Sequence, residues 1–238
     1  MFSGITEWIN ELMTDPSGTL ITLADGSQKP VEELTGEETL LVWNLETGSL
    51  DEAPIVFVDS DPEQVYEIIT LHFSDGTTVD VISEHGFFDL DLAEYVYLDE
   101  NAADFIGHRF AKSGAPGDAV TLTDVTVREE TTAAWSPVTF GHLCYYVNGM
   151  LSMPGGIRGL FNIFEVNVET MTYDADAMAR DIAEYGLFTL EDFGGMITEE
   201  AFYAFNGAYL KVAIGKGLLT WEDIAYLAER YIPLMEAQ

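Results

Sequence analysis

The sequence has few basic residues, a single cysteine and no long apolar segment. Lys and Arg number 9 against 42 Asp and Glu, so the 238-residue chain has a formal net charge of -33. Proteins that bind nucleic acid without sequence preference rely on Lys and Arg to neutralise phosphates, and anionic membranes attract basic segments for the same reason. The composition therefore excludes ordinary DNA or RNA binding and disfavours anionic membrane surfaces.

The lone cysteine, Cys144, excludes a disulfide framework within the chain. The four histidines lack metal-ligand spacing, which predicts no structural zinc site, and we expect no cofactor. Neither a secretory signal with a basic start nor an apolar run long enough for membrane insertion is visible. Carboxylates gather at residues 59–61 and 89–94 without the spacing of a calcium loop, so divalent cations are kept as candidate ligands of the acidic surface.

Short apolar runs separated by turn residues dominate the region from residue 18 to residue 154. Hydrophobic residues make up 47% of the whole chain, too many for a disordered acidic tail. Asp25-Gly26 between apolar residues predicts a β-hairpin whose two turn residues both have positive φ. Further strands are expected at residues 39–43, 53–59, 65–73, 78–82, 95–98 and 120–130. This pattern is typical of an all-β domain.

Helical patterns flank the β region on both sides. Residues 1–16 place six apolar side chains on one face of a helix that Pro16 ends: Phe2, Ile5, Trp8, Ile9, Leu12 and Met13. From about residue 175 the period is helical, and residues 186–193 resemble residues 217–224. The fold class is therefore mainly β. We expect an N-terminal amphipathic helix over 1–16, an all-β domain over 17–155, and a C-terminal segment over 156–238 that forms a small all-α domain from about residue 175.

Four segments, taken in order, resemble the Hedgehog/intein (Hint) domain family. They are the opening hairpin at residues 18–26, a strand and Thr-Gly turn at 40–50, a histidine-bearing block at 75–88 and a final strand pair at 143–151. The resemblance implies a Hint-like all-β fold. The helix starts of the C-terminal segment also resemble the small XkdX-type proteins of phage tail-fibre gene clusters, which implies a phage or prophage context.

The resemblance implies a chemistry whose residues are mostly missing here. Active Hint domains attack the preceding carbonyl with a Cys or Ser at their first residue, and a Thr-x-x-His block orients the bond and protonates the leaving nitrogen. In this chain the first position falls near Asp15 or Ser17, and no cysteine is close. Ile82 replaces the threonine of the block, whereas His85 is kept. The family's reaction is therefore expected to be lost at this end of the domain.

The residues that inteins need at the final junction are also missing. Met153 and Pro154 stand where inteins have a His-Asn pair, and proline cannot cyclise as that asparagine does. We therefore predict a non-catalytic Hint-fold scaffold or protein-interaction module, in a phage particle or a bacterial surface assembly, with a protein partner or further copies of itself. Two alternatives stay open: a self-cleaving Hint domain that uses Ser17 with His85 as general acid, and an acidic DNA-mimic inhibitor.

An interaction surface needs exposed apolar or aromatic side chains. Adjacent residues of a strand face opposite ways, so one member of each neighbouring pair of tyrosines can be exposed. The candidate binding residues on this basis are Tyr95, Tyr97, Tyr145 and Tyr146.

Overall fold

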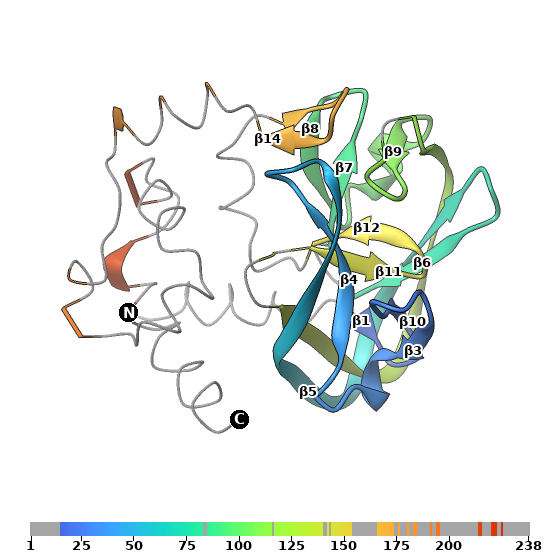
Figure 1. Ribbon diagram of the computed structural model, residues 1–238. Coiled ribbons are helices and arrows are strands. Elements are labelled where there is room, and N and C mark those ends of the chain that lie inside the picture. Colours follow the sequence, from blue (N-terminus) through green and yellow to red (C-terminus); the bar gives the residue numbers. More distant parts are fainter. Residues whose placement is uncertain are drawn as a thin grey trace.

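The computed structural model describes residues 15–82, 85–115, 117–139, 142, 144–153 and 166–173, with scattered single positions between 176 and 225 (Figure 1). Residues 1–14 of the helix expected over 1–16, and most of the helical C-terminal segment, lie outside the described residues. Single described positions there, such as 176, 180, 214 and 221, have helical backbone. Over the described part of the chain, no helix has the length and apolar character that crossing a bilayer requires.

A long antiparallel ribbon organises the β domain. β5 (Ser49–Phe73) and β10 (Ala119–Thr139) pair along most of their lengths. The other members of this eight-stranded sheet are β1 (Asp15–Pro16), β4 (Thr39–Asn44), β6 (Thr78–Val81), β7 (His85–Asp89), β8 (Glu94–Leu98) and β9 (Arg109–Ala111). Because β1 pairs with β10, residues 15 and 16 belong to the β domain and not to a helix ending at residue 16.

The start and the end of the domain meet in a second sheet. Its order is β12 (Met150–Ser152), β11 (Tyr145–Val147), β2 (Leu20–Thr22) and β3 (Gln28–Pro30), with Val147 opposite Ile21. Two short 3-10 helices, η1 (Val31–Glu33) and η2 (Ala102–Phe105), lie in the connections. The strand pairing confirms the hairpin predicted at the start of the domain.

The turn of that hairpin differs from the prediction. Gly26 has a φ of 82°, but Asp25 is absent from the residues with positive φ among those described. The Asp25 carboxylate instead accepts hydrogen bonds from the backbone N–H and the hydroxyl of Ser27, at 2.9 and 2.6 Å. Asp75 holds the turn at Gly76 in the same way, through Thr77. Asp-Gly therefore marks both turns correctly, while only the glycine needs the left-handed conformation.

The two longest strands run further than the sequence indicated. The separate strands expected at 53–59 and 65–73 are one continuous element, β5, which passes through Pro62. The register of β5 against β10 shifts between Thr132 and Ala134, opposite this proline. A bulge leaves one residue without a ladder partner, so it accommodates a proline that has no N–H to donate. The strand expected at 120–130 likewise continues to Thr139 in β10.

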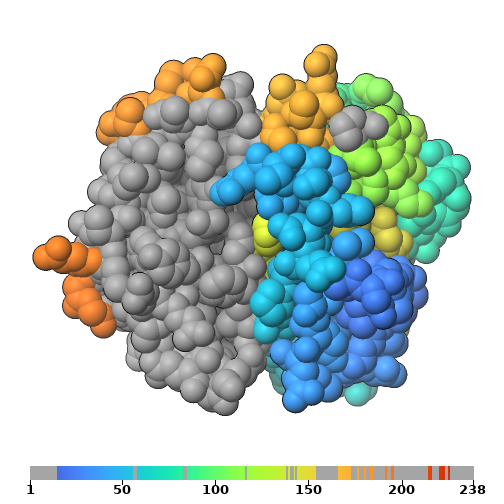
Figure 2. Space-filling model, in the orientation of Figure 1, coloured from blue at the N-terminus to red at the C-terminus, as the bar shows by residue number. Residues whose placement is uncertain are grey.

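A β-hairpin from beyond the domain completes its core. β13 (Val166–Asn167) and β14 (Thr172–Tyr173) pair and lie against the tip of the β4–β5 hairpin (Figures 1 and 2). The Trp43 indole N–H donates to the Met171 carbonyl at 2.8 Å, and the side chains of Val166 and Met171 are buried in the same core as Trp43. The chain therefore returns to the β domain after residue 153.

Candidate active centre

A carboxylic acid and an imidazole face each other in the interior of the β domain. The side chains of Asp15 and His85 are both fully buried, and His85 Nε2 lies 3.9 Å from Asp15 Oδ1. The Tyr145 hydroxyl donates to Asp15 Oδ2 at 2.7 Å. Within the described residues, Asp15 Oδ1 and both ring nitrogens of His85 have no hydrogen-bond partner. The arrangement is a small polar cluster enclosed by apolar packing. Its unpaired carboxyl oxygen and ring nitrogens can still form hydrogen bonds.

Burial controls the protonation of both groups. It raises the pKa of Asp15 to about 7, although the hydrogen bond from Tyr145 acts against this rise. It lowers the pKa of His85 to about 3. A buried group favours its uncharged form because the low-dielectric interior solvates a charge poorly. Near neutral pH the imidazole is therefore uncharged, and a large share of the Asp15 carboxyls carry a proton.

Distant parts of the sequence converge on this centre. β1 places Asp15 opposite Trp135 of β10, and β11 supplies Tyr145. His85 begins β7, and the next residue, Gly86, exchanges two backbone hydrogen bonds with Met153, each 2.9 Å long. The start of the β domain, the histidine-bearing segment and the final strand pair are thus brought together.

Asp15, and not Ser17, is the residue beside His85. The Ser17 side chain is exposed, and its hydroxyl oxygen accepts a hydrogen bond from the Trp135 indole at 3.0 Å. The Ser17 backbone N–H donates to Ala133 of β10 at 3.2 Å. This corrects the alternative that paired Ser17 with His85. β1 ends at Pro16, and Ser17 begins the turn that follows, where its side chain is exposed beside Trp135.

The candidate binding tyrosines do not form an exposed surface. None of the four exceeds 5% exposure: Tyr95, Tyr97, Tyr145 and Tyr146. The ring of Tyr95 packs edge-on against Phe88 with centroids 5.0 Å apart, and the Tyr146 hydroxyl donates to the Ser113 carbonyl at 2.6 Å. The expectation of alternating exposure is wrong because β8 and β11 are covered on both faces. One of the four, Tyr145, belongs to the buried centre instead.

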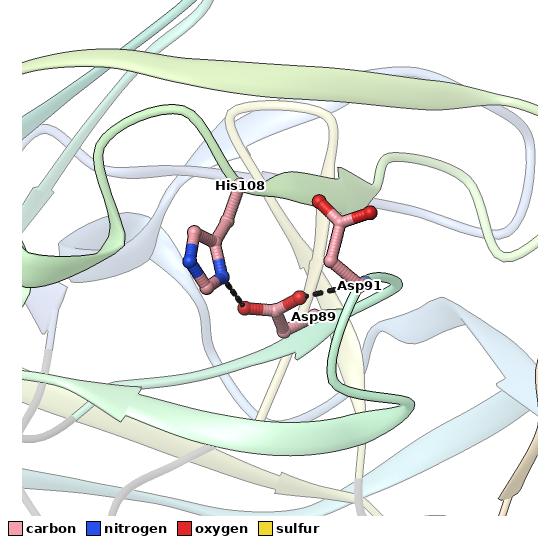
Figure 3. Close-up of side chains that lie close together, drawn as sticks. All are labelled: Asp89, Asp91 and His108. Carbon is pink, nitrogen blue, oxygen red and sulfur yellow. Dashed lines mark hydrogen bonds and ion pairs between the residues drawn. The ribbon is translucent and has the colours of Figure 1, made fainter.

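A second polar cluster joins Asp89, Asp91 and His108 (Figure 3). No metal-ligand spacing in the sequence pointed to this histidine, yet one ligand atom from each residue lies within 4.8 Å of the others. His108 Nδ1 is 2.6 Å from Asp89 Oδ2, and Asp89 Oδ1 accepts the backbone N–H of Asp91 at 2.8 Å. The Arg109 guanidinium donates to Asp91 at 2.6 Å and lowers its pKa. Groups of the protein thus contact the oxygens of both carboxylates.

The single thiol is placed where it cannot react. Cys144 is buried, and its Sγ–H donates to the Trp43 carbonyl at 3.1 Å. Burial raises the pKa of this thiol to about 12. Because the thiolate is the reactive form of cysteine, Cys144 has the properties of a packing residue.

No family model matches the sequence. The Tiggy-winkle hedgehog protein of Danio rerio is 28% identical over 137 residues, which are 52% of this chain and 31% of that protein, so the match spans about a third of that relative's length. The bacterial intein-like domain from Clostridium thermocellum superposes with a TM-score of 0.50 at 14% identity, covering 60% of this chain and 98% of that domain. A DnaB intein from Synechocystis gives 0.47 at 16% identity, covering 59% and 98%. The β domain of this chain has a Hint-like fold.

Proposed function

We propose that this Hint-fold domain is a scaffold that has lost the thiol or hydroxyl acyl shift and the splicing step, and that it holds its flanking segments for contact with a protein partner or with further copies of the chain. The observation that carries the proposal is the pair at the centre. A carboxylic acid, Asp15, stands beside His85 at the position where a nucleophilic cysteine or serine is needed.

The remaining candidate nucleophiles support the same conclusion. The Cys144 thiol is buried and protonated, and the Ser17 hydroxyl is bound to Trp135 at the surface. Ile82, in the place of the threonine of the block, offers no hydrogen-bond donor to a peptide bond. An acyl shift requires an activated nucleophile within reach of a general acid or base, and the described residues do not supply that combination.

The contacts made by the chain beyond residue 153 favour a permanent scaffold and not a domain that is excised. Val166 and Met171 contribute to the core, and the Met171 carbonyl satisfies the indole N–H of Trp43. Cutting near Met153 would separate these groups from the domain that they help to fill. A phage particle or a bacterial surface assembly is the setting we propose, on the resemblance of the C-terminal helix starts alone.

Intact mass of the chain between an N-terminal and a C-terminal tag tests the loss of chemistry. At neutral pH, with and without a strong thiol or hydroxylamine, we expect no cleavage of the peptide bond between residues 14 and 15 and none near residue 153. Ser17→Ala should leave the mass pattern unchanged because Ser17 is remote from His85. Fragments that end at residue 14, or near Met153, would contradict the scaffold proposal.

Restoring the missing groups tests whether residue 15 occupies the nucleophile position. Asp15→Cys combined with Ile82→Thr should give hydroxylamine-sensitive cleavage of the bond before residue 15, roughly tenfold or more above the unaltered chain, because a thiol then lies beside His85. The matched control, Ser17→Cys with Ile82→Thr, places the thiol at the surface beside Trp135 and should not cleave. Equal cleavage in both variants, or in neither, would show that residue 15 is not that position.

A further inference from the structure

The buried acid of the centre is followed directly by a proline. Asp15 and Pro16 together form β1, so the Asp15 carboxyl and the Asp15–Pro16 peptide bond occupy the same buried place. Attack of a side-chain oxygen of Asp15 on its own carbonyl carbon closes a five-membered ring, and such intramolecular attack has a large effective concentration. The proline nitrogen is a tertiary amide without an N–H, which makes it a better leaving group than an ordinary peptide nitrogen.

We propose that this centre breaks the Asp15–Pro16 bond and so releases whatever precedes residue 16. A bond forms between an Asp15 carboxyl oxygen and the Asp15 carbonyl carbon. The bond from that carbon to the Pro16 nitrogen breaks, its electron pair stays on nitrogen, and the carboxyl proton ends on that nitrogen. The products are a cyclic anhydride at residue 15 and a free proline amine. Water then opens the anhydride to the two carboxyl groups of a C-terminal aspartic acid.

His85 and Tyr145 are placed to assist this reaction. Tyr145 holds one carboxyl oxygen by its hydroxyl at 2.7 Å. The other oxygen faces His85 Nε2 at 3.9 Å, and in the described residues this nitrogen has no other hydrogen-bond partner. A small movement would bring the uncharged imidazole within hydrogen-bond reach of the carboxyl O–H, which it can then orient, while the proton itself passes from the carboxyl to the leaving nitrogen. This role differs from the acyl shift of Hint domains, which acts on the bond before the nucleophile, so the inference goes beyond the proposed scaffold function and does not depend on it.

The surroundings of Asp15 keep its carboxyl protonated into the neutral range. Among the described residues, the titratable groups that face it are His85 of β7 and Tyr145 of β11, while Asp80 of β6 is paired with Arg128. The facing end of β10, residues 132–139, contains no charged residue. Since the reaction consumes the protonated carboxyl, its rate should rise as the pH falls through about 7 and level off near pH 5.

The chain contains its own control, a second Asp-Pro sequence at Asp61-Pro62. This bond lies on β5, where Asp61 is half-buried and Pro62 is exposed. The two bonds have the same local chemistry, and the full-length protein exposes both to the same solution. A difference in their rates therefore reports the buried centre and not the intrinsic lability of an Asp-Pro bond.

The test is a time course of the full chain at about pH 8, 6 and 5, with fragment masses as the readout. We expect fragments 1–15 and 16–238 to accumulate roughly tenfold or more faster than 1–61 and 62–238 at pH 6. In urea, where the centre is unfolded, the two bonds should break at similar rates. Equal rates in the folded protein, or no change between pH 8 and pH 5, would overturn the proposal.

Three variants assign the roles. Asp15→Asn removes the reacting acid but keeps the size of the side chain, and it should abolish the pH-dependent cleavage. Pro16→Ala keeps the acid and should slow the cleavage by making the leaving group an ordinary peptide nitrogen. His85→Gln should slow it and distort its pH profile. A cooperative urea-unfolding transition confirms folding of each variant, and the Asp61–Pro62 rate serves as the reference for intrinsic Asp-Pro cleavage. A cut after residue 15 leaves the proposed loss of the acyl shift intact, although it frees the segment before residue 16, whereas a cut after residue 14 contradicts that loss. The masses of the two N-terminal fragments differ by one aspartate.

Discussion

Asp15→Asn is expected to raise the free energy of unfolding by about 4 kcal/mol at pH 8 and by much less near pH 4. The pKa of Asp15 is about 7 in the folded protein, against 3.8 for the free side chain. The folded state therefore binds the proton more tightly than the unfolded state does. As the pH rises from about 4 to about 7, the unfolded chain loses its proton first, and the native protein loses stability. Asparagine has no proton to lose and can still accept the hydrogen bond of Tyr145.

Urea unfolding of the two proteins between pH 4 and pH 8 measures this difference directly. Asp25→Asn is the control, because the pKa shift of Asp25 has the opposite sign: the hydrogen bonds from Ser27 lower the pKa of this exposed carboxyl. Removing that carboxylate should cost stability by the same small amount at every pH above about 5. A difference between Asp15→Asn and the unaltered chain that stays constant with pH would show that the Asp15 carboxyl is ionised in the fold.

Gly114→Ala is expected to destabilise the β domain by roughly 2–5 kcal/mol. Gly114 has a φ of 82°, and a Cβ atom there would lie 2.5 Å from Trp43 Cδ2. The left-handed conformation costs an alanine about 1–2 kcal/mol, and forcing extra volume into a packed core costs about 1–3 kcal/mol more. Trp43 cannot move aside freely because its indole N–H is bound to the Met171 carbonyl.

Gly117→Ala is the matched control in the same loop. Gly117 has a φ of 85°, but nothing lies within 4 Å of a Cβ atom placed there. This variant should show the backbone cost alone, of about 1–2 kcal/mol. The difference between the two midpoints in thermal unfolding then isolates the contact with Trp43. If the two alanines cost the same, the indole is not fixed in the place that the hydrogen bond to Met171 implies.

The order of the strands follows from local signals, whereas the length of the ribbon does not. Asp-Gly turns, apolar runs and a Thr-Gly turn are short-range features, and each predicted an element that the structure contains. The middle of the ribbon is different, since residues 62–67 of β5 and 123–131 of β10 are largely exposed. A strand that is solvated on both faces has no alternation of apolar and polar residues to detect. Pro62 is typical of a strand end, but β5 continues through it because a bulge accommodates the proline.

The composition of the centre could not be read from the sequence because its members are far apart in it. Asp15, His85 and Tyr145 come from β1, β7 and β11, and no spacing rule connects them. The family resemblance located His85 and narrowed the first position to two residues. The structure then shows which of the two lies beside His85: it is Asp15, whereas the Ser17 hydroxyl contacts Trp135. The exposure of the tyrosines was misjudged for a related reason: Tyr145 is buried against Asp15 and Tyr146 against Ser113, residues 130 and 33 positions earlier in the chain.

The hydrogen bond between Trp43 and Met171 joins residues 128 positions apart. During synthesis, everything from residue 15 to residue 153 leaves the ribosome before Met171 does. Until then the indole N–H of Trp43 lacks its native acceptor, and the apolar faces that Val166 and Met171 cover are open. Since Met171 is made after every strand of the β domain up to β12, the emerging chain passes through a stage in which those strands can pair while the domain is still uncapped. Chaperone contact or premature association would be concentrated in that interval.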